Sequence, residues 1–155
     1  MLRDLVARHG VTAAFLTTAL FNVIAETDPG ALGLLRLAAA GGEAAAPGVL
    51  QRLAAAHTDT VVLHVYGPTE TTTFATVHRV RADDAPAARP DRPAAGRRTV
   101  YVLDAALRPV PSGAEGELYV AGPGVARGYL GAPASRPPGS SPTRSTAQGT
   151  HVPHR

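Results

Sequence analysis

Apolar residues along the first half of the chain alternate between helical and extended spacing. A helical spacing predicts a short helix over Leu2–His9, which ends at Gly10 as a C-cap. An apolar run then predicts a buried strand at residues 11–15. The same reading predicts helices at residues 17–25 and 47–56, a short apolar run at residues 37–40, and strands at residues 61–65 and 74–80. Strands that alternate with helices indicate α/β layering.

The second half of the chain has a different pattern. Residues 82–98 are rich in Pro, Ala and Arg and show no periodicity, so we expect a loop there. Strands are predicted at residues 99–103 and 117–121, which makes this part β-rich. After Leu130 the residues are mostly Ser, Pro, Thr, Gly, Arg and His, and we expect residues 131–155 to be disordered.

The composition bears on the stability of the chain and on the partners it can bind. A chain of 155 residues can form one domain, but only 5% of its residues are aromatic, so we expect an isolated unit to be weakly stable. The net charge is +3, and the arginines thicken only around Arg89, Arg92, Arg97 and Arg98. We interpret that cluster as a solvated loop, with a nucleic-acid patch as the alternative.

The sequence also indicates where the protein works. It has no cysteine, and its six histidines do not fall at a metal-ligand spacing, so a zinc site is not expected. We find no signal peptide, and no apolar run reaches the ~18 residues of a membrane span. We therefore expect a cytoplasmic protein that binds neither membrane nor nucleic acid.

The strongest local signal is the segment Tyr-Gly-Pro-Thr-Glu-Thr-Thr at residues 66–72, directly after a predicted strand. Ligands bind at the carboxyl ends of strands in α/β sheets. A turn at Gly67 and Pro68 would present an aromatic ring, hydroxyl groups and a carboxylate, which suit a base, phosphate oxygens and Mg²⁺. For these residues alone, an ordinary turn before a Thr-capped helix is the alternative.

Three motifs together resemble a known family. Residues 65–76 are similar to the nucleotide-binding signature of the adenylation (AMP-binding) domains of nonribosomal peptide synthetases, in the adenylate-forming superfamily. Residues 116–130 resemble a second motif of that family, and residues 41–44 a third. The resemblance implies an α/β fold: a fragment of the large N-terminal subdomain of an adenylate-forming enzyme at residues 1–81, joined by the 82–98 loop to part of its small β-barrel at residues 99–130.

The resemblance also implies roles for individual residues. Tyr66 would pack against adenine, Thr69 would contact the α-phosphate region, and Glu70 would hold Mg²⁺. Thr69 and Glu70 are therefore the expected catalytic residues. Glycines would allow close approach of the backbone to the ligand. The expected nucleotide-binding residues are Gly41, Gly42, Tyr66, Gly67 and Thr69.

A side-chain pocket for the substrate follows from the same resemblance. Its six positions are Phe15, Ala39, Gly41, Val65, Thr73 and Phe74. None is charged, and an unpaired charge in an apolar pocket is costly, so the resemblance favours an apolar, aliphatic amino acid. Simple core packing is the alternative, most directly for Phe15.

The implied reaction joins an amino acid to MgATP, forming an aminoacyl-adenylate and pyrophosphate, and then passes the aminoacyl group to the phosphopantetheine of a carrier domain. The family also needs a phosphate loop, two aspartates and a catalytic lysine that this sequence does not contain; its basic residues other than His are all Arg. We therefore expect a truncated fragment that is inactive in isolation. The alternatives are a degraded gene product without catalytic function, and a fragment of a related acyl-CoA or aryl-acid ligase.

The tail suggests how such a fragment could arise. Back-translated and read from each codon's third base, residues 134–149 permit Leu-Thr-Ala-Ala-Arg-Phe-Val-Ala-Asp-Pro-Phe-Asp-Gly-Pro-Gly. Residues 150–155, read from the second base, permit Arg-Met-Tyr-Arg-Thr-Gly. Both strings resemble what the family shows after its Gly-Tyr-Leu. We expect two frame slips, by mutation or sequencing error, with a natural disordered tail as the alternative.

Overall fold

The computed structural model describes residues 2–46, 48–84, 94–111, 113–130 and 143–144. The chain divides into two compact units, which are described separately. The first comprises Met1–Tyr66 with Val77–Ala88, and the second Gly67–Thr76 with Arg89–Arg155. Of the helices in the described residues, none has the length and apolar character needed to cross a membrane.

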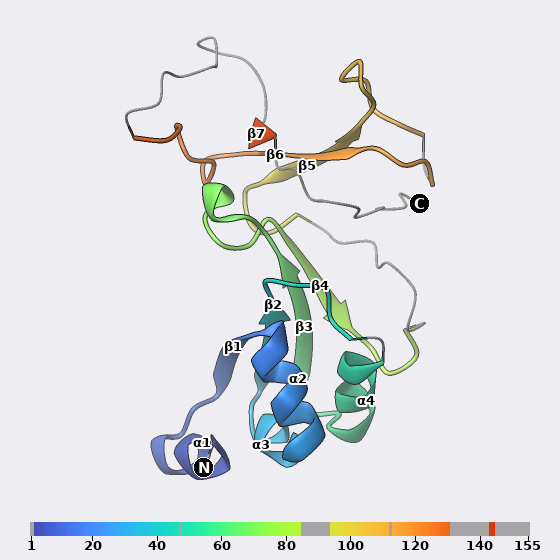
Figure 1. Ribbon diagram of the computed structural model, residues 1–155. Helices are drawn as coiled ribbons and strands as arrows, with labels where there is room; N and C mark the ends of the chain where they lie inside the picture. The colour runs from blue at the N-terminus through green and yellow to red at the C-terminus, as the bar shows by residue number, and fades with distance from the viewer. Residues whose placement is uncertain (1, 47, 85–93, 112, 131–142, 145–155) are drawn as a thin grey trace. The chain divides into compact units, whose positions relative to one another are not determined.

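The first unit is built on a sheet with the strand order β1-β2-β3-β4 (Figure 1). Strands β1, β2 and β3 are parallel, and Ala13, Leu37 and Val61 lie side by side at the start of the register. The elements along the chain are α1 (Leu2–His9), β1 (Ala13–Thr17), α2 (Thr18–Thr27), α3 (Pro29–Gly33), β2 (Leu37–Gly41), α4 (Val49–Ala56), β3 (Val61–Tyr66) and β4 (Thr76–Val80).

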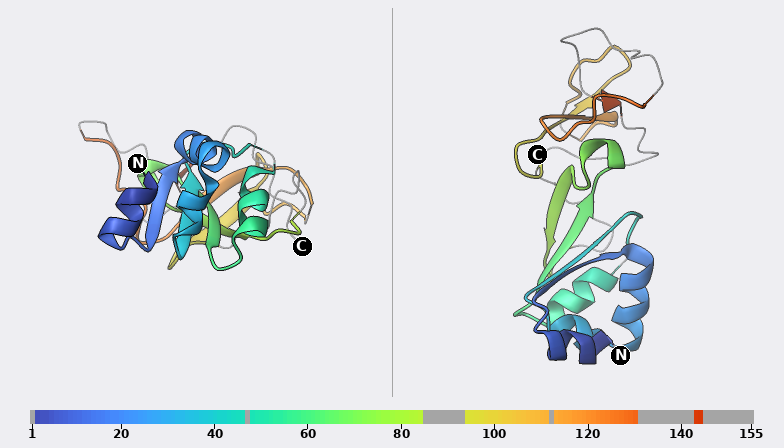
Figure 2. Two further views of the ribbon diagram at one scale, coloured as in Figure 1. Left: turned by 90° about the horizontal axis from the view of Figure 1, so that it is seen from below. Right: turned by 90° about the vertical axis from the view of Figure 1, so that its left-hand side faces the viewer.

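The core of this unit lies between one face of the sheet and the helices (Figure 2). Ala38 and Ala40 of β2 lie on that face beside Val62 of β3, because every second side chain along a strand points to the same face. The helices contribute buried apolar side chains at Phe21, Leu32, Leu50 and Leu53. The small side chains of β2 leave room for these larger groups to pack.

Most of the predicted elements are confirmed, with some corrections to their bounds. The predicted buried strand at residues 11–15 is wrong in place and burial: β1 begins at Ala13, and its residues are exposed or half-buried because it lies at the end of the strand order. Helix α2 starts one residue later than predicted, since the Thr17 hydroxyl accepts a hydrogen bond from the Leu20 N–H as its cap.

Two further helices differ from the prediction. The sequence does not predict helix α3, because Pro29 and Gly30 are typical of turns; in the structure they begin a short helix. A proline in the first helical turn is well tolerated. Helix α4 begins at Val49 after Gly48, whose φ of +78° suits glycine, and the predicted start at Pro47 lies outside the described residues.

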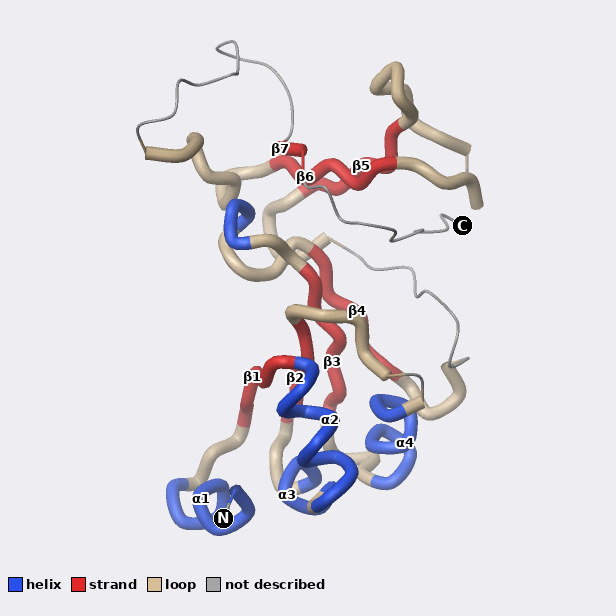
Figure 3. Tube along the Cα trace, in the orientation of Figure 1, coloured by secondary structure: helices blue, strands red, loops and turns tan. Residues whose placement is uncertain are grey.

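The second unit holds a three-stranded antiparallel sheet with the order β5-β6-β7. Its elements are η1 (Thr69–Thr71), β5 (Thr99–Leu103), β6 (Glu117–Ala121) and β7 (Thr143–Arg144), and Figure 3 separates them from the loops by colour. The predicted strands β5 and β6 are confirmed to the residue.

Strand β7 falls within residues 131–155, the segment that the sequence predicts to be disordered. Thr143 and Arg144 pair with Val120 and Tyr119 of β6. The pairing uses the edge of β6 opposite the one that pairs with β5. The predicted frame-shifted tail otherwise lies outside the described residues.

Candidate functional site

The residues of the strongest motif form a tight loop at residues 67–74, which we call the 67–74 loop. It follows β3 and contains the one-turn helix η1. The Thr71 N–H and hydroxyl both donate to the Pro68 carbonyl, at 3.0 and 2.9 Å, and the Thr72 N–H donates to the Thr69 carbonyl at 3.1 Å. Because Thr71 is fully buried, its side chain anchors the turn from inside.

The backbone of the 67–74 loop turns through an unusual conformation. Thr72 and Thr73 have φ values of +57° and +68°, in the left-handed region that β-branched residues rarely adopt. A residue held there costs about 1–3 kcal/mol, so neighbouring contacts must hold it in place. The loop also folds back onto Gly67, where a Cβ would lie 2.3 Å from the Thr73 carbonyl oxygen. Only glycine fits at that position.

Arg98 supplies contacts that hold this conformation. Its Nε donates to the Thr71 carbonyl at 3.0 Å and its Nη2 to the Thr72 carbonyl at 2.9 Å. Its Nη1 donates to the Ala95 carbonyl at 3.2 Å. The interpretation of Arg98 as part of a solvated cluster is therefore wrong: the side chain is half-buried and bonded to backbone carbonyls.

A second segment, from Gly122 to Leu130, contacts the same loop. The Thr72 hydroxyl donates to the Gly124 carbonyl at 2.7 Å. The Ala126 N–H donates to the Glu70 carbonyl, also at 2.7 Å. The motif at residues 116–130 and the motif at residues 65–76 therefore meet in the second unit.

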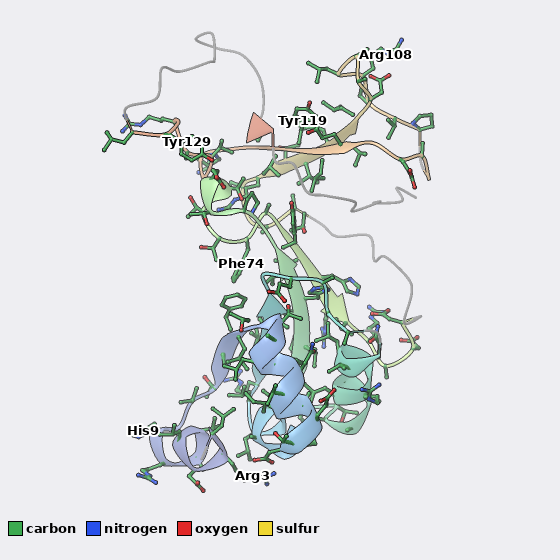
Figure 4. The ribbon with its side chains drawn as sticks, in the orientation of Figure 1. Arg3, His9, Phe74, Arg108, Tyr119 and Tyr129 are labelled. Atoms are coloured by element: carbon green, nitrogen blue, oxygen red, sulfur yellow. The ribbon has the colours of Figure 1, made fainter. Side chains whose placement is uncertain are left out.

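Glu70 is held through its side chain as well as its backbone. Its carboxylate accepts a hydrogen bond from the Tyr129 hydroxyl, and Figure 4 shows Tyr129 beside the η1 turn. This hydrogen bond lowers the pKa of the Glu70 carboxyl below its ordinary value and raises the pKa of Tyr129. Glu70 is thus an ionised, oriented and partly exposed acceptor, next to the exposed Thr69 hydroxyl.

No group of three or more potential metal ligands from His, Cys, Asp and Glu occurs among the residues that the structure describes.

Four of the six predicted pocket residues lie in the first unit and share one face of the sheet. Phe15 pairs in register with Ala39, and Gly41 pairs with Val65, on the face opposite Ala38 and Ala40. A Cβ at Gly41 would lie 3.3 Å from the Phe15 ring and 2.6 Å from Val65 Cγ2. The four positions are therefore clustered near the carboxyl ends of the strands.

The burial of these residues differs. Ala39 and Val65 are buried, whereas the Phe15 side chain is 48% exposed. Gly42, with a φ of +100°, follows at an exposed turn where no atom would meet a Cβ. Tyr66 ends β3 and is half-buried. Thr73 and Phe74 belong to the second unit, where Thr73 is exposed and Phe74 half-buried.

Comparisons with known proteins agree with the three motifs. The family of AMP-binding enzymes matches residues 1–130. The nonribosomal peptide synthetase asaC of Aspergillus flavus is 40% identical over 137 residues, covering 85% of this chain and 13% of that protein. Tyrocidine synthase 3 of Brevibacillus parabrevis is 36% identical over 135 residues, covering 85% of this chain and 2% of that protein. The chain thus spans a small part of these relatives.

Solved structures show the same fold. Holo-PA1221, described as a nonribosomal peptide synthetase protein with adenylation and PCP domains, superposes with a TM-score of 0.75 at 32% identity, over 84% of this chain and 23% of that one. The N-terminal subdomain of Klebsiella oxytoca NpsA gives a TM-score of 0.76 at 24% identity, over 83% of this chain and 33% of that one. The resemblance inferred from the motifs is confirmed: the chain belongs to the AMP-binding enzyme family, within the adenylation domains of nonribosomal peptide synthetases.

Proposed function

We propose that this chain contributes the nucleotide loop and part of the substrate pocket to an amino-acid adenylation reaction. In that reaction a carboxylate oxygen of the amino acid bonds to the α-phosphorus of ATP, and pyrophosphate leaves. The observation that carries the proposal is the Glu70 carboxylate, oriented by Tyr129 on a loop that is braced by Ala126 and Arg98. Preorganised charge of this kind is the main catalytic contribution in phosphoryl chemistry.

The proposed roles follow the chemistry of the exposed groups. Glu70 holds Mg²⁺, an ion that takes one or two protein carboxylates and completes its shell with phosphate oxygens and water. The Thr69 hydroxyl contacts the α-phosphate, and Gly67 gives the loop the tight turn that presents both residues. Tyr66 packs against adenine, while Gly41 and Gly42 let the backbone approach the nucleotide and the substrate.

We propose an aliphatic amino acid as the substrate. The clustered pocket positions of the first unit, Phe15, Ala39, Gly41 and Val65, carry no charge and no hydrogen-bonding side chain. A charged substrate side chain placed there would lose its hydration without gaining a partner. Thr73 and Phe74, in the second unit, are the other two positions that the family resemblance implies.

The aminoacyl group then passes to the phosphopantetheine thiol of a carrier domain. Support comes from holo-PA1221, which contains adenylation and PCP domains in one protein. We propose that the reaction takes place in the cytoplasm and uses further segments, since the family's catalytic lysine has no counterpart in this sequence. An inactive gene product is the alternative that the experiment below tests.

A chimaera tests the proposal. Residues 1–130 replace the matching segment of an active relative, such as an adenylation domain of tyrocidine synthase 3, and ATP–pyrophosphate exchange is measured with each of the twenty amino acids. We expect exchange with an aliphatic amino acid. Glu70→Gln should lower exchange about 100-fold, the size of losing one preorganised electrostatic contact.

Glu26→Gln is the matched control, because it removes an exposed carboxylate from α2 and should leave exchange unchanged. A folded chimaera that exchanges with no amino acid would favour the inactive gene product. Exchange that survives Glu70→Gln would remove Glu70 from its proposed role.

A further inference from the structure

The Arg98 side chain donates to two carbonyls of the 67–74 loop and to the carbonyl of Ala95, three residues before it in the chain. Its three donor nitrogens reach Thr71, Thr72 and Ala95, at 3.0, 2.9 and 3.2 Å. The guanidinium is a rigid planar fork, so one side chain can fix the relative positions of several carbonyls. Lysine, with a single ammonium group on a flexible stem, cannot span the same set.

The bonds from Arg98 fall where the loop is most strained. Thr71 and Thr72 provide the carbonyls, and Thr72 and Thr73 are the two residues with positive φ. A left-handed β-branched residue persists only where its surroundings hold it. The Phe74 N–H also donates to the Thr72 carbonyl, at 3.0 Å, so this carbonyl accepts hydrogen bonds from both Arg98 and Phe74.

Two glycines of the second motif lie close to Arg98, Gly124 beside its side chain and Gly122 beside its backbone. A Cβ at Gly124 would lie 2.6 Å from Arg98 Nη2, and a Cβ at Gly122 would lie 3.1 Å from the Arg98 Cα. The first distance is shorter than any normal contact and the second is tighter than most, so a larger residue at either glycine would displace the side chain or the backbone of Arg98. The Gly122–Gly124 segment also bonds to the loop directly, through the Thr72 hydroxyl.

We propose that Arg98 is a positioning residue, which holds the 67–74 loop in the conformation that presents Thr69 and Glu70 to the nucleotide. It touches no reacting atom; it acts through the backbone of Thr71 and Thr72. The statement about nucleotide rests on the proposed function, whereas the statement about loop conformation does not.

Hydrogen–deuterium exchange on the full 155-residue chain tests the loop. In Arg98→Ala we expect the amides of Thr71, Thr72, Phe74 and Ala126 to exchange about tenfold faster, the size of losing a charge-assisted hydrogen bond. The Val102 and Val120 amides, in β5 and β6, should keep their rates. Arg98→Lys should restore only part of the protection.

The matched control is Arg97→Ala, which removes the same charge from the exposed neighbouring position and should leave the loop rates unchanged. Unchanged loop rates in Arg98→Ala would overturn the proposal. So would an equal acceleration of Val102 and Val120, because that would make Arg98 a support of the whole sheet.

Titration of the same variants with MgATP separates the two proposals. If the unaltered chain binds MgATP, Arg98→Ala should weaken binding relative to Arg97→Ala, and equal affinities would overturn the positioning role. If no variant binds MgATP while the hydrogen-exchange pattern is as expected, Arg98 still holds the loop conformation, and the proposal that this chain binds the nucleotide is refuted.

Discussion

Replacing Gly41 with alanine places a methyl group where β2 and β3 approach each other closely. The added Cβ would lie 2.7 Å from the Val65 carbonyl oxygen and 2.6 Å from Val65 Cγ2. The Val65 carbonyl belongs to the backbone of a paired strand, so it cannot move without disturbing the pairing of Gly41 with Val65. The new methyl group therefore pushes the two strands apart.

The size of the effect follows from two opposing contributions. Overpacking of this kind costs about 1–3 kcal/mol. Alanine also restricts the unfolded chain, which returns about 0.4–1 kcal/mol where the native backbone accepts it. Gly41 has no positive φ, so that gain applies. We expect a net loss of ~1–2 kcal/mol, a factor of about 5–30 in the opening equilibrium.

Native-state hydrogen exchange measures this loss locally. The amides of β2 and β3 should exchange about 5–30-fold faster in Gly41→Ala. Gly30→Ala in α3 is the control, because its Cβ would meet the end of the Arg3 side chain; any loss should be confined to the exposed Arg3–Asp28 pair and leave the exchange of β2 and β3 unchanged. If β2 and β3 exchange no faster in Gly41→Ala than in the unaltered chain, the close approach of these strands is refuted.

Three further outcomes are expected. Phe21→Ala, at a fully buried side chain, should lower the free energy of opening of the first unit by about 3–5 kcal/mol by hydrogen exchange, and Phe15→Ala, at a 48% exposed one, by clearly less. The hydrogen bond from Arg3 lowers the pKa of Asp28, so the stability that this hydrogen bond contributes should be present above pH ~4 and lost as the pH falls further. Asp28→Asn should remove this pH dependence from the hydrogen exchange of α1. At raised concentration the purified chain should self-associate, since β1 is an edge strand with exposed apolar neighbours; sedimentation as a monomer at every concentration would contradict this.

The sequence predicted local elements well because their signals are local. β5 and β6 match their predicted bounds, and β3 extends only one residue beyond its prediction. Alternation of apolar residues depends on positions two apart, which a single sequence displays directly. Helix α3 was missed because Pro29 and Gly30 are also typical of turns.

Contacts that brace the site lie beyond the reach of such patterns. The Thr72 hydroxyl meets Gly124 across 52 positions, and Glu70 meets Tyr129 across 59. Nothing in the spacing of Arg98 distinguishes it from its exposed neighbour Arg97. The resemblance identified the two motifs separately, but only the structure brings them together in one unit.

The register of the parallel strands bears on how the first unit assembles. Ala13, Leu37 and Val61 pair side by side, so each strand follows its neighbour at the same interval of 24 residues. Closing two loops of equal length carries nearly equal entropy, so chain length gives neither strand pair an advantage. During synthesis, however, β2 leaves the ribosome long before β3. The β1–β2 pair can therefore form first, and β2 serves as the template onto which β3 is added.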